Sequence, residues 1–117
     1  MSGPYFQRVQ LIGMTGDQPE FKILPNNPFS RFNVAVDEWY KNRETGKNTK
    51  ITTWFRCSAF GKTAEHAKNI IEPGKMIFIE GRLRVRRTED REFWSITVDT
   101  FRMLDKRERN LTQETEE

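Results

Sequence analysis

Apolar residues recur at every second position in five segments of this chain, and they follow a helical spacing in only one. Alternation places successive side chains on opposite faces of a strand, so each of the five segments predicts a strand with one buried face. The predicted strands are residues 7–14, 31–40, 51–60, 76–86 and 93–104, with residues 21–24 expected to continue the first.

A helical spacing replaces the alternation at residues 61–71 and predicts a short amphipathic helix that Pro73-Gly74 ends. Its apolar positions are Ala64, Ala67, Ile70 and Ile71. The helix lies between the third and fourth predicted strands. A five-stranded barrel with a helix at that place is the OB-fold arrangement. We therefore predict an all-β OB-fold domain over residues 1–104, followed by a short, polar, disordered tail at 105–117.

Large aromatic side chains occupy the face of the third predicted strand that should meet solvent. Phe55, Cys57 and Ala59 alternate towards a core, whereas the opposite face presents Trp54, Arg56 and Phe60. Aromatic rings along a strand, with a cation among them, form a surface on which unpaired bases stack. The alternative is that the parity is inverted and the two aromatic residues belong to the core.

Residues before this strand extend the candidate binding surface. Trp39 falls on the non-core face of the second predicted strand. The segment that follows, residues 41–50, is polar, contains Lys41 and Lys50, and predicts an exposed hairpin arm with a basic tip.

The fourth and fifth strands add further candidates. Arg82, Arg84 and Arg86 alternate along one face of the fourth strand. That pattern suits contacts with a phosphate backbone, or else a solvated edge whose cations prevent aggregation. Trp94 shares its parity with Ile96, so it either packs in the core or flanks the binding groove.

Composition excludes several classes of protein. The chain has 117 residues, of which 35% are hydrophobic and 32% charged, with a net charge of +3. These values predict one domain with a modest core and offer weak support for a polyanionic partner. No apolar run is long enough for a transmembrane helix, and the N-terminus does not read as a secretory signal.

The chain lacks the residues that catalytic and metal-binding sites usually need. The chain has one histidine and one cysteine, Cys57, so the usual ligands cannot build a zinc site and no nucleophile–base pair can be assembled from them. A single cysteine also excludes an internal disulfide and suits a reducing compartment. We expect neither enzymatic activity nor a cofactor.

The sequence resembles the bacterial-type single-stranded DNA-binding proteins, including their mitochondrial relatives. The motif Trp-x-Arg-x-x-x-Phe-Gly-Lys at residues 54–62 carries the resemblance together with Ile-Glu-Gly-x-Leu at residues 79–83. Further matching segments are residues 11–13, 16–20, 32–36 and 73–74.

This resemblance implies an OB-fold homotetramer that binds single-stranded DNA without strong sequence preference. It implies protection of the strand during replication, recombination or repair, in the cytoplasm with the nucleoid or in the mitochondrial matrix of an organellar member. The implied stacking residues are Trp39, Trp54 and Phe60, and the implied phosphate contacts are Arg56, Lys62, Arg84 and Arg86. The remaining candidate binding residues are Lys41, Lys50, Arg82, Phe93 and Trp94.

The sequence departs from the family at two places. Thr88 stands where many bacterial members carry a further stacking tryptophan, which makes Phe93 or Trp94 the candidate substitute. Members usually end in an acidic tip with a terminal phenylalanine that recruits replication and repair proteins, whereas this sequence ends in Glu116-Glu117. This difference argues against recruitment by that route and leaves replication and repair proteins as an open alternative among the partners.

Two other functions fit the same fold. One is a protein-interaction module of the kind found in primosome accessory proteins, and the other is a binder of single-stranded RNA, because base stacking does not distinguish RNA from DNA.

Overall fold

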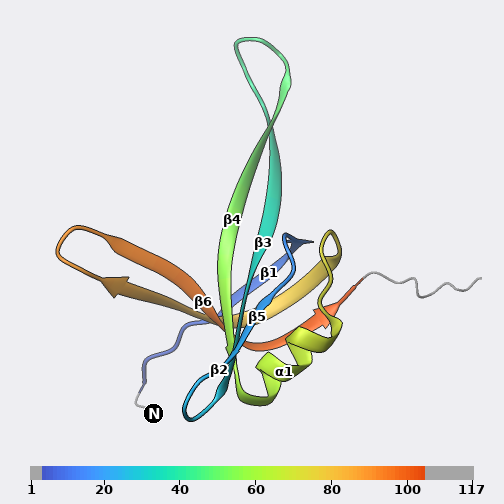
Figure 1. Ribbon diagram of the computed structural model, residues 1–117. Coiled ribbons are helices and arrows are strands. Elements are labelled where there is room, and N and C mark those ends of the chain that lie inside the picture. Colours follow the sequence, from blue (N-terminus) through green and yellow to red (C-terminus); the bar gives the residue numbers. More distant parts are fainter. Residues whose placement is uncertain (1–3, 105–117) are drawn as a thin grey trace, which may run out of the picture.

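The computed structural model describes residues 4–104 and contains six strands and one helix (Figure 1). The predicted tail at residues 105–117 lies outside the described residues. The elements are β1 (Val9–Thr15), β2 (Glu20–Ile23), β3 (Pro28–Lys41), β4 (Asn48–Phe60), α1 (Gly61–Ile70), β5 (Met76–Arg87) and β6 (Glu92–Met103).

Five strands close into a barrel in the order β1, β5, β6, β4, β3 and back to β1. β1 runs antiparallel to β5 along its length and meets β3 at Met14 and Thr15. The seam between β4 and β6 is parallel and pairs Cys57 with Ile96. This closed barrel, with α1 between its third and fourth strands, confirms the predicted all-β OB fold.

The expectation that residues 21–24 continue the first strand is wrong. They form β2, which pairs with the beginning of β3 through the register Glu20 to Arg31 and Ile23 to Pro28. The chain leaves the barrel wall after Thr15, and the turn with Pro19 redirects it, so that β2 lies beside β3 outside the closed ring.

Alternation along the barrel strands builds a small core. Val34, Cys57, Ala59 and Ile79 have no exposed surface. The helix closes the core with Ala64 and Ala67 on its buried side, together with Ile71 just beyond its end. Burial raises the pKa of the Cys57 thiol to about 12, because a thiolate would have to form without water around it. That side chain therefore acts as a neutral packing residue.

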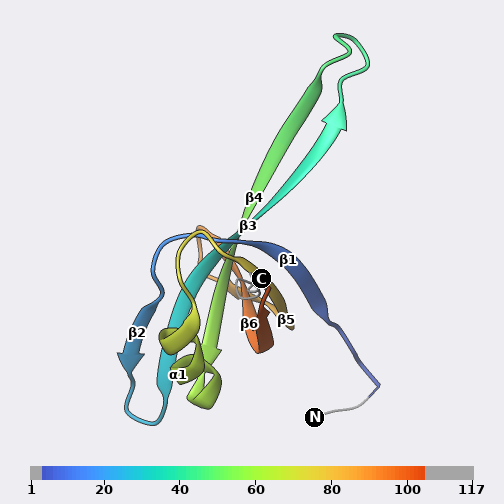
Figure 2. The ribbon, with the colours of Figure 1, turned by 90° about the vertical axis from the view of Figure 1, so that its right-hand side faces the viewer.

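Two hairpins project from the barrel. β3 and β4 pair without interruption from Phe29 with Phe60 to Lys41 with Asn48, and this hairpin rises well beyond the barrel (Figure 1, Figure 2). β5 and β6 form the second hairpin, whose tip lies between Arg87 and Glu92. The strands run further into the arm predicted at residues 41–50 than expected, which leaves only residues 42–47 as its tip.

α1 does not reach the length of a membrane. Among residues 4–104, no helix is long and apolar enough to cross a lipid bilayer.

Candidate nucleic-acid interface

The outer face of the β3–β4 hairpin displays the predicted aromatic residues. Trp39 is 66% exposed, Trp54 60% and Phe60 43%, whereas Cys57 and Ala59 between them point into the core. The prediction that Trp54 and Phe60 lie on a non-core face is confirmed, and the alternative of inverted parity is wrong.

The register places cations beside these rings. Lys50 lies opposite Trp39, and its Nζ is 5.9 Å from the centroid of the indole ring. Arg56 follows Trp54 on the same face and lies opposite Asn33. We call the exposed outer face of this hairpin, from Trp39 to Phe60, the β3–β4 track. Its aromatic members are Phe29, Trp39, Trp54 and Phe60, and its cationic members are Arg31, Lys50 and Arg56.

The track is a long and narrow surface. Trp54 follows Lys50 by four residues on β4, and Phe60 follows Trp54 by six. At the rise of an extended strand these intervals are about 13 Å and about 20 Å. Aromatic rings are therefore spread along the hairpin instead of gathering in one cluster.

Gly16 allows Trp54 to lie against the barrel. A Cβ added to this glycine would lie 3.0 Å from Cζ3 of the indole ring, closer than a relaxed contact. The Gly16 amide also donates a hydrogen bond to the carbonyl of Asn33, which holds the turn after β1 beside the track.

Two members of the track were missing from the sequence-based candidates. They are Phe29 and Arg31. The ring centroids of Phe29 and Phe60 lie 5.2 Å apart, and the guanidinium carbon of Arg31 lies 5.8 Å from the centroid of the Phe29 ring. β3 begins at Pro28, three residues before the predicted start. Extending the alternation back from Arg31 would have placed Phe29 on the outer face.

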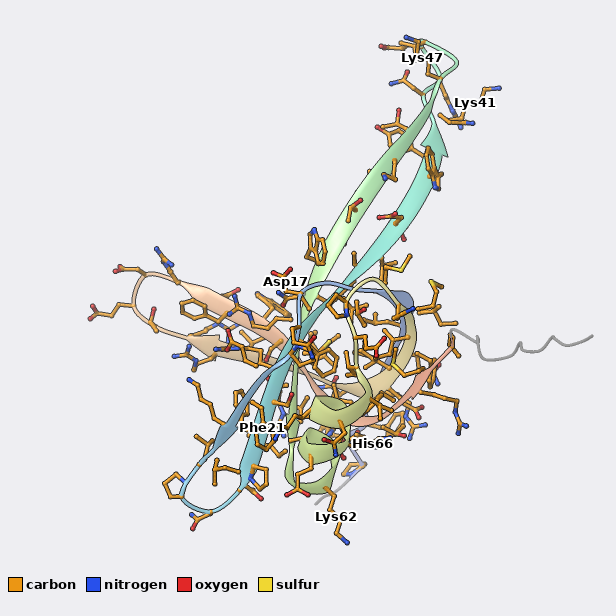
Figure 3. The ribbon with its side chains drawn as sticks, turned by 45° about the vertical axis from the view of Figure 1, so that its right-hand side comes forward. Asp17, Phe21, Lys41, Lys47, Lys62 and His66 are labelled. Carbon is orange, nitrogen blue, oxygen red and sulfur yellow. The ribbon has the colours of Figure 1, made fainter. Side chains whose placement is uncertain are left out.

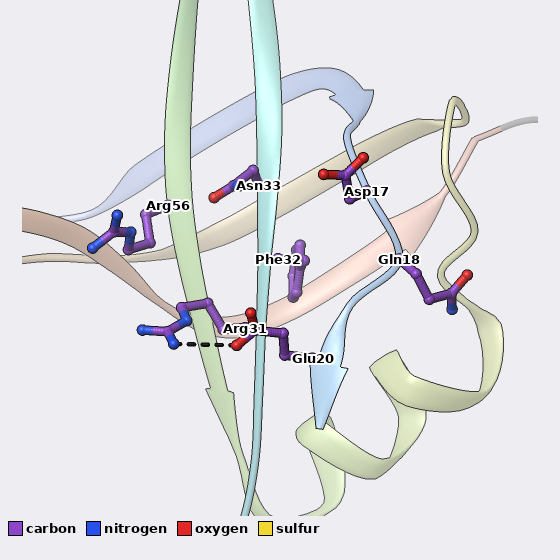
Figure 4. Close-up of a pocket in the computed structure, with 7 residues that line it drawn as sticks. All are labelled: Asp17, Gln18, Glu20, Arg31, Phe32, Asn33 and Arg56. Atoms are coloured by element: carbon purple, nitrogen blue, oxygen red, sulfur yellow. Dashed lines mark hydrogen bonds and ion pairs between the residues drawn. The ribbon is translucent and has the colours of Figure 1, made fainter. Parts of the chain in front are cut away.

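A polar hollow lies beside the track, between β3 and the turn that leads into β2 (Figure 4). Arg31 donates a hydrogen bond to Glu20 at 3.1 Å, and Asp17 and Arg56 also line the hollow. Carboxylates therefore line this hollow together with guanidinium groups, and one of these groups is already paired, so the hollow is less suited to a phosphate than the open part of the track.

The arginines of β5 lie on one exposed face, as predicted, but their surroundings differ. Arg82 donates two hydrogen bonds to the carboxylate of Asp99, at 2.9 and 3.3 Å. The guanidinium carbon of Arg86 lies 4.7 Å from the centroid of the Phe93 ring. Within residues 4–104, Arg84 has no ion pair. Arg84 and Arg86 are thus the β5 cations without a carboxylate partner in the described part of the chain.

The other two lysine candidates, Lys41 and Lys62, lie far apart on the molecule. Lys41 is exposed near the tip of the β3–β4 hairpin, whereas Lys62 is exposed at the start of α1, two residues after Phe60 (Figure 3). The structure therefore places Lys41 and Lys62 near opposite ends of the β3–β4 track.

Trp94 does not pack in the core. It is 50% exposed, although Ile96 on the same face of β6 is buried. β6 begins in the β5–β6 hairpin, outside the barrel, and its alternation of side chains is the same there. In the hairpin no other strand packs against the face that is buried in the barrel. Trp94 instead lines a hollow between the two hairpins together with Trp54 and Arg56, so the second alternative, a residue at the edge of the groove, describes its position.

Comparison with known proteins gives one family and several structural neighbours. A family model described as the single-strand binding protein family matches residues 6–104. A small single-stranded DNA-binding protein from Streptomyces coelicolor is 26% identical, with a TM-score of 0.68, over 83% of this chain and 91% of its own.

Two further structures share the fold. A Plasmodium falciparum SSB protein in complex with single-stranded DNA is 21% identical, with a TM-score of 0.77, over 90% of this chain and 100% of its own. The single-stranded DNA-binding protein from Thermus aquaticus is 24% identical, with a TM-score of 0.72, over 86% of this chain. The match spans only 50% of the Thermus protein.

Proposed function

The chain belongs to the single-strand binding protein family, and we propose that it binds single-stranded DNA without strong sequence preference. The observation that carries this proposal is the β3–β4 track, where Trp39, Trp54 and Phe60 are exposed beside cations on one strand face. Family membership also favours a binding protein over an enzyme.

Stacking accounts for binding without sequence preference. Every base has a π-face, so Trp39, Trp54 and Phe60 accept any base, each for about 1–3 kcal/mol. The Arg56 guanidinium stacks on a base or contacts a phosphate. Lys50 beside Trp39 adds positive charge, which Asp37 at 3.9 Å from its Nζ partly offsets. Lys41, Lys62, Arg84 and Arg86 are the further cations that we assign to the phosphates.

We also propose that four copies assemble into a homotetramer and that the protein protects single strands during replication, recombination or repair. The support for this step is the resemblance of the sequence to the family. Native mass spectrometry tests the assembly, with a mass of about four chains expected. A monomer or dimer at micromolar concentration would contradict it.

The binding proposal is tested with the change Trp54→Ala. Oligo-dT should quench the tryptophan fluorescence of the wild type, and a duplex of equal length should not. The variant should remain folded by circular dichroism and bind oligo-dT about 5- to 150-fold more weakly, the equivalent of one stacked base. A folded wild type that binds no oligo-dT would overturn the proposal, and tighter binding of oligo-rU would favour RNA instead.

A further inference from the structure

A further hollow lies between α1 and β6, beyond the end of the β3–β4 track. Its lining comes from the first half of α1 and from one segment of β6, and consists of Lys62, Thr63, His66, Asp99, Thr100 and Phe101. The side chains of Lys62 and His66 both project from α1 (Figure 3). We call this site the α1–β6 hollow.

Lys62 and His66 are neighbours on the surface of α1. Four residues separate them along the chain, and side chains at this spacing lie about 5–6 Å apart on a helix. Phe60, the last aromatic residue of the β3–β4 track, precedes Lys62 by two residues. A strand that continues past Phe60 along α1 therefore meets Lys62 first and His66 one turn later.

The imidazole of His66 is oriented by the core and remains accessible. Its ring centroid lies 5.0 Å from that of Phe101, a core residue that is only 8% exposed. His66 itself is exposed. Contact with the phenylalanine ring restricts the imidazole before a ligand arrives, so less conformational entropy is lost on binding.

The charges around His66 favour an anion once the imidazole is protonated. Asp99 of β6 is the carboxylate that lines the hollow, and it already accepts two hydrogen bonds from Arg82 of β5, at 2.9 and 3.3 Å. Lys62 has no ion pair within the described residues 4–104. Glu65 precedes His66 on α1 but does not line the hollow. Protonation of His66 would therefore place two cations beside a carboxylate that is already paired.

His66 is the only histidine of the chain, and histidine is the side chain whose charge ordinarily changes between pH 5 and 8. A protonated imidazole donates from both nitrogens, and phosphate oxygens accept such bonds strongly. We propose that Lys62 and His66 form a phosphate-binding subsite for a strand that continues past Phe60, and that protonation of His66 makes this subsite sensitive to pH. The proposal rests on the proposed binding of single-stranded DNA and extends the binding surface from the β3–β4 track onto α1.

Affinity for fluorescently labelled oligo-dT, measured by anisotropy near pH 5.5 and near pH 8, tests the subsite. The wild type should bind about 2- to 5-fold more tightly in acid, as expected for one exposed ionic contact. The slope of log K against log salt should also be about 0.7 greater in magnitude there, because one more phosphate is neutralised. His66→Gln should match the wild type near pH 8 and should lose both differences.

His66→Lys and Glu65→Gln form a matched pair of variants. Each raises the charge of α1 by about one unit near pH 8, but only His66→Lys places the added charge in the α1–β6 hollow. His66→Lys should bind near pH 8 as tightly as the wild type does near pH 5.5, whereas Glu65→Gln should keep the pH dependence of the wild type. If both variants strengthen binding equally, the effect is one of net charge and the subsite is wrong.

NMR signals of the imidazole give a direct test, because one histidine produces one set of signals. The terminal amino group also titrates near neutral pH, and these signals separate His66 from it. Near neutral pH, oligo-dT should move the imidazole signals toward their position in acid, because a bound phosphate favours the charged form. An abasic strand of equal length should do the same. A response to oligo-dT alone would mean that a base stacks on the ring, and the phosphate subsite would be wrong.

The outcomes for the two proposals are distinct. If the wild type binds no oligo-dT at either pH, the proposed function fails and the subsite with it. If it binds equally at both pH values and the imidazole signals do not respond, the function stands and the subsite is overturned. A pH dependence that persists in His66→Gln would also overturn the subsite, because other groups would then be responsible.

Discussion

The hydroxyl of Ser30 is the residue-scale feature with the clearest effect on stability. Ser30 is completely buried in β3, and within residues 4–104 its Oγ has no hydrogen-bond partner. A buried polar group without a partner costs roughly 1–3 kcal/mol. We therefore expect Ser30→Ala to raise the free energy of unfolding by about 1 kcal/mol in urea titrations. A loss of stability would mean that the hydroxyl is paired in solution.

Cys57 predicts how stability depends on alkaline pH. Its thiol has an ordinary pKa of 9.0, which burial raises to about 12 in the folded protein. The unfolded chain therefore releases this proton first as the pH rises. Stability should fall between pH 9 and pH 12 with a limiting slope of roughly 1.4 kcal/mol per pH unit.

Other groups also titrate in this range, so the measurement is a comparison with Cys57→Ala. The difference in the free energy of unfolding between wild type and variant should shrink as the pH rises above 9. A constant difference would show that the thiol does not control this dependence.

Whether a side chain is exposed could be predicted from the sequence only where the alternation along its strand matches the part of the strand that lies in the barrel. The position of Trp54 is predictable because the alternation of β4 is clear and its inner residues Cys57 and Ala59 are buried. The position of Trp39 follows from the same alternation along β3, although both faces of the hairpin are exposed there. Trp94 shares its parity with buried residues, yet it is half exposed because the barrel ends before the hairpin does. Where a barrel ends depends on contacts between distant segments, which alternation within one strand cannot reveal.

At the scale of elements, Gly13 allows β1 to pass over β3 where the barrel closes. A Cβ at this position would overlap the carbonyl oxygen of Ala35, and the side chain of Val34 lies 2.8 Å away. Because the carbonyl belongs to the backbone of a paired strand, it cannot move aside cheaply. We expect Gly13→Ala to lower the free energy of unfolding by roughly 1–3 kcal/mol.

Gly16→Ala is the matched control for this change. Its nearest contact is the exposed ring of Trp54 at 3.0 Å, which is able to shift. Thermal unfolding should therefore show a much smaller loss than for Gly13→Ala. Equal losses would contradict the role of Gly13 in closing the barrel.

The elements themselves were largely predictable, and their partners were not. Five alternating segments and one helical segment in a fixed order were enough to predict the OB fold. The prediction that residues 21–24 continue the first strand is wrong, because the pairing of β2 with β3 is set by the turn after Gly16 and not by the sequence of the segment itself. The same limitation hid Phe29, which faces Phe60 only because β3 begins at Pro28.

At the scale of the whole molecule, ion pairs decide which cations remain for a polyanion. Arg8 pairs with Glu80 and Arg31 with Glu20, and Lys50 lies 3.9 Å from Asp37. The net charge is only +3. Long-range attraction is therefore modest, and stacking has to supply much of the affinity that we propose.

Arg82 and Arg84 form a matched pair with which to test this distribution of charge. Both are exposed on the same face of β5, but only Arg82 is held by a carboxylate, Asp99. Each phosphate contact with a single strand contributes a slope of about 0.7 to the dependence of log K on log salt. Arg84→Ala should lower the magnitude of this slope for oligo-dT by about 0.7, and Arg82→Ala should lower it less. If the two variants change the slope equally, the Arg82–Asp99 pair opens when the strand binds. In that case the variant Asp99→Asn should show the same salt dependence as the wild type.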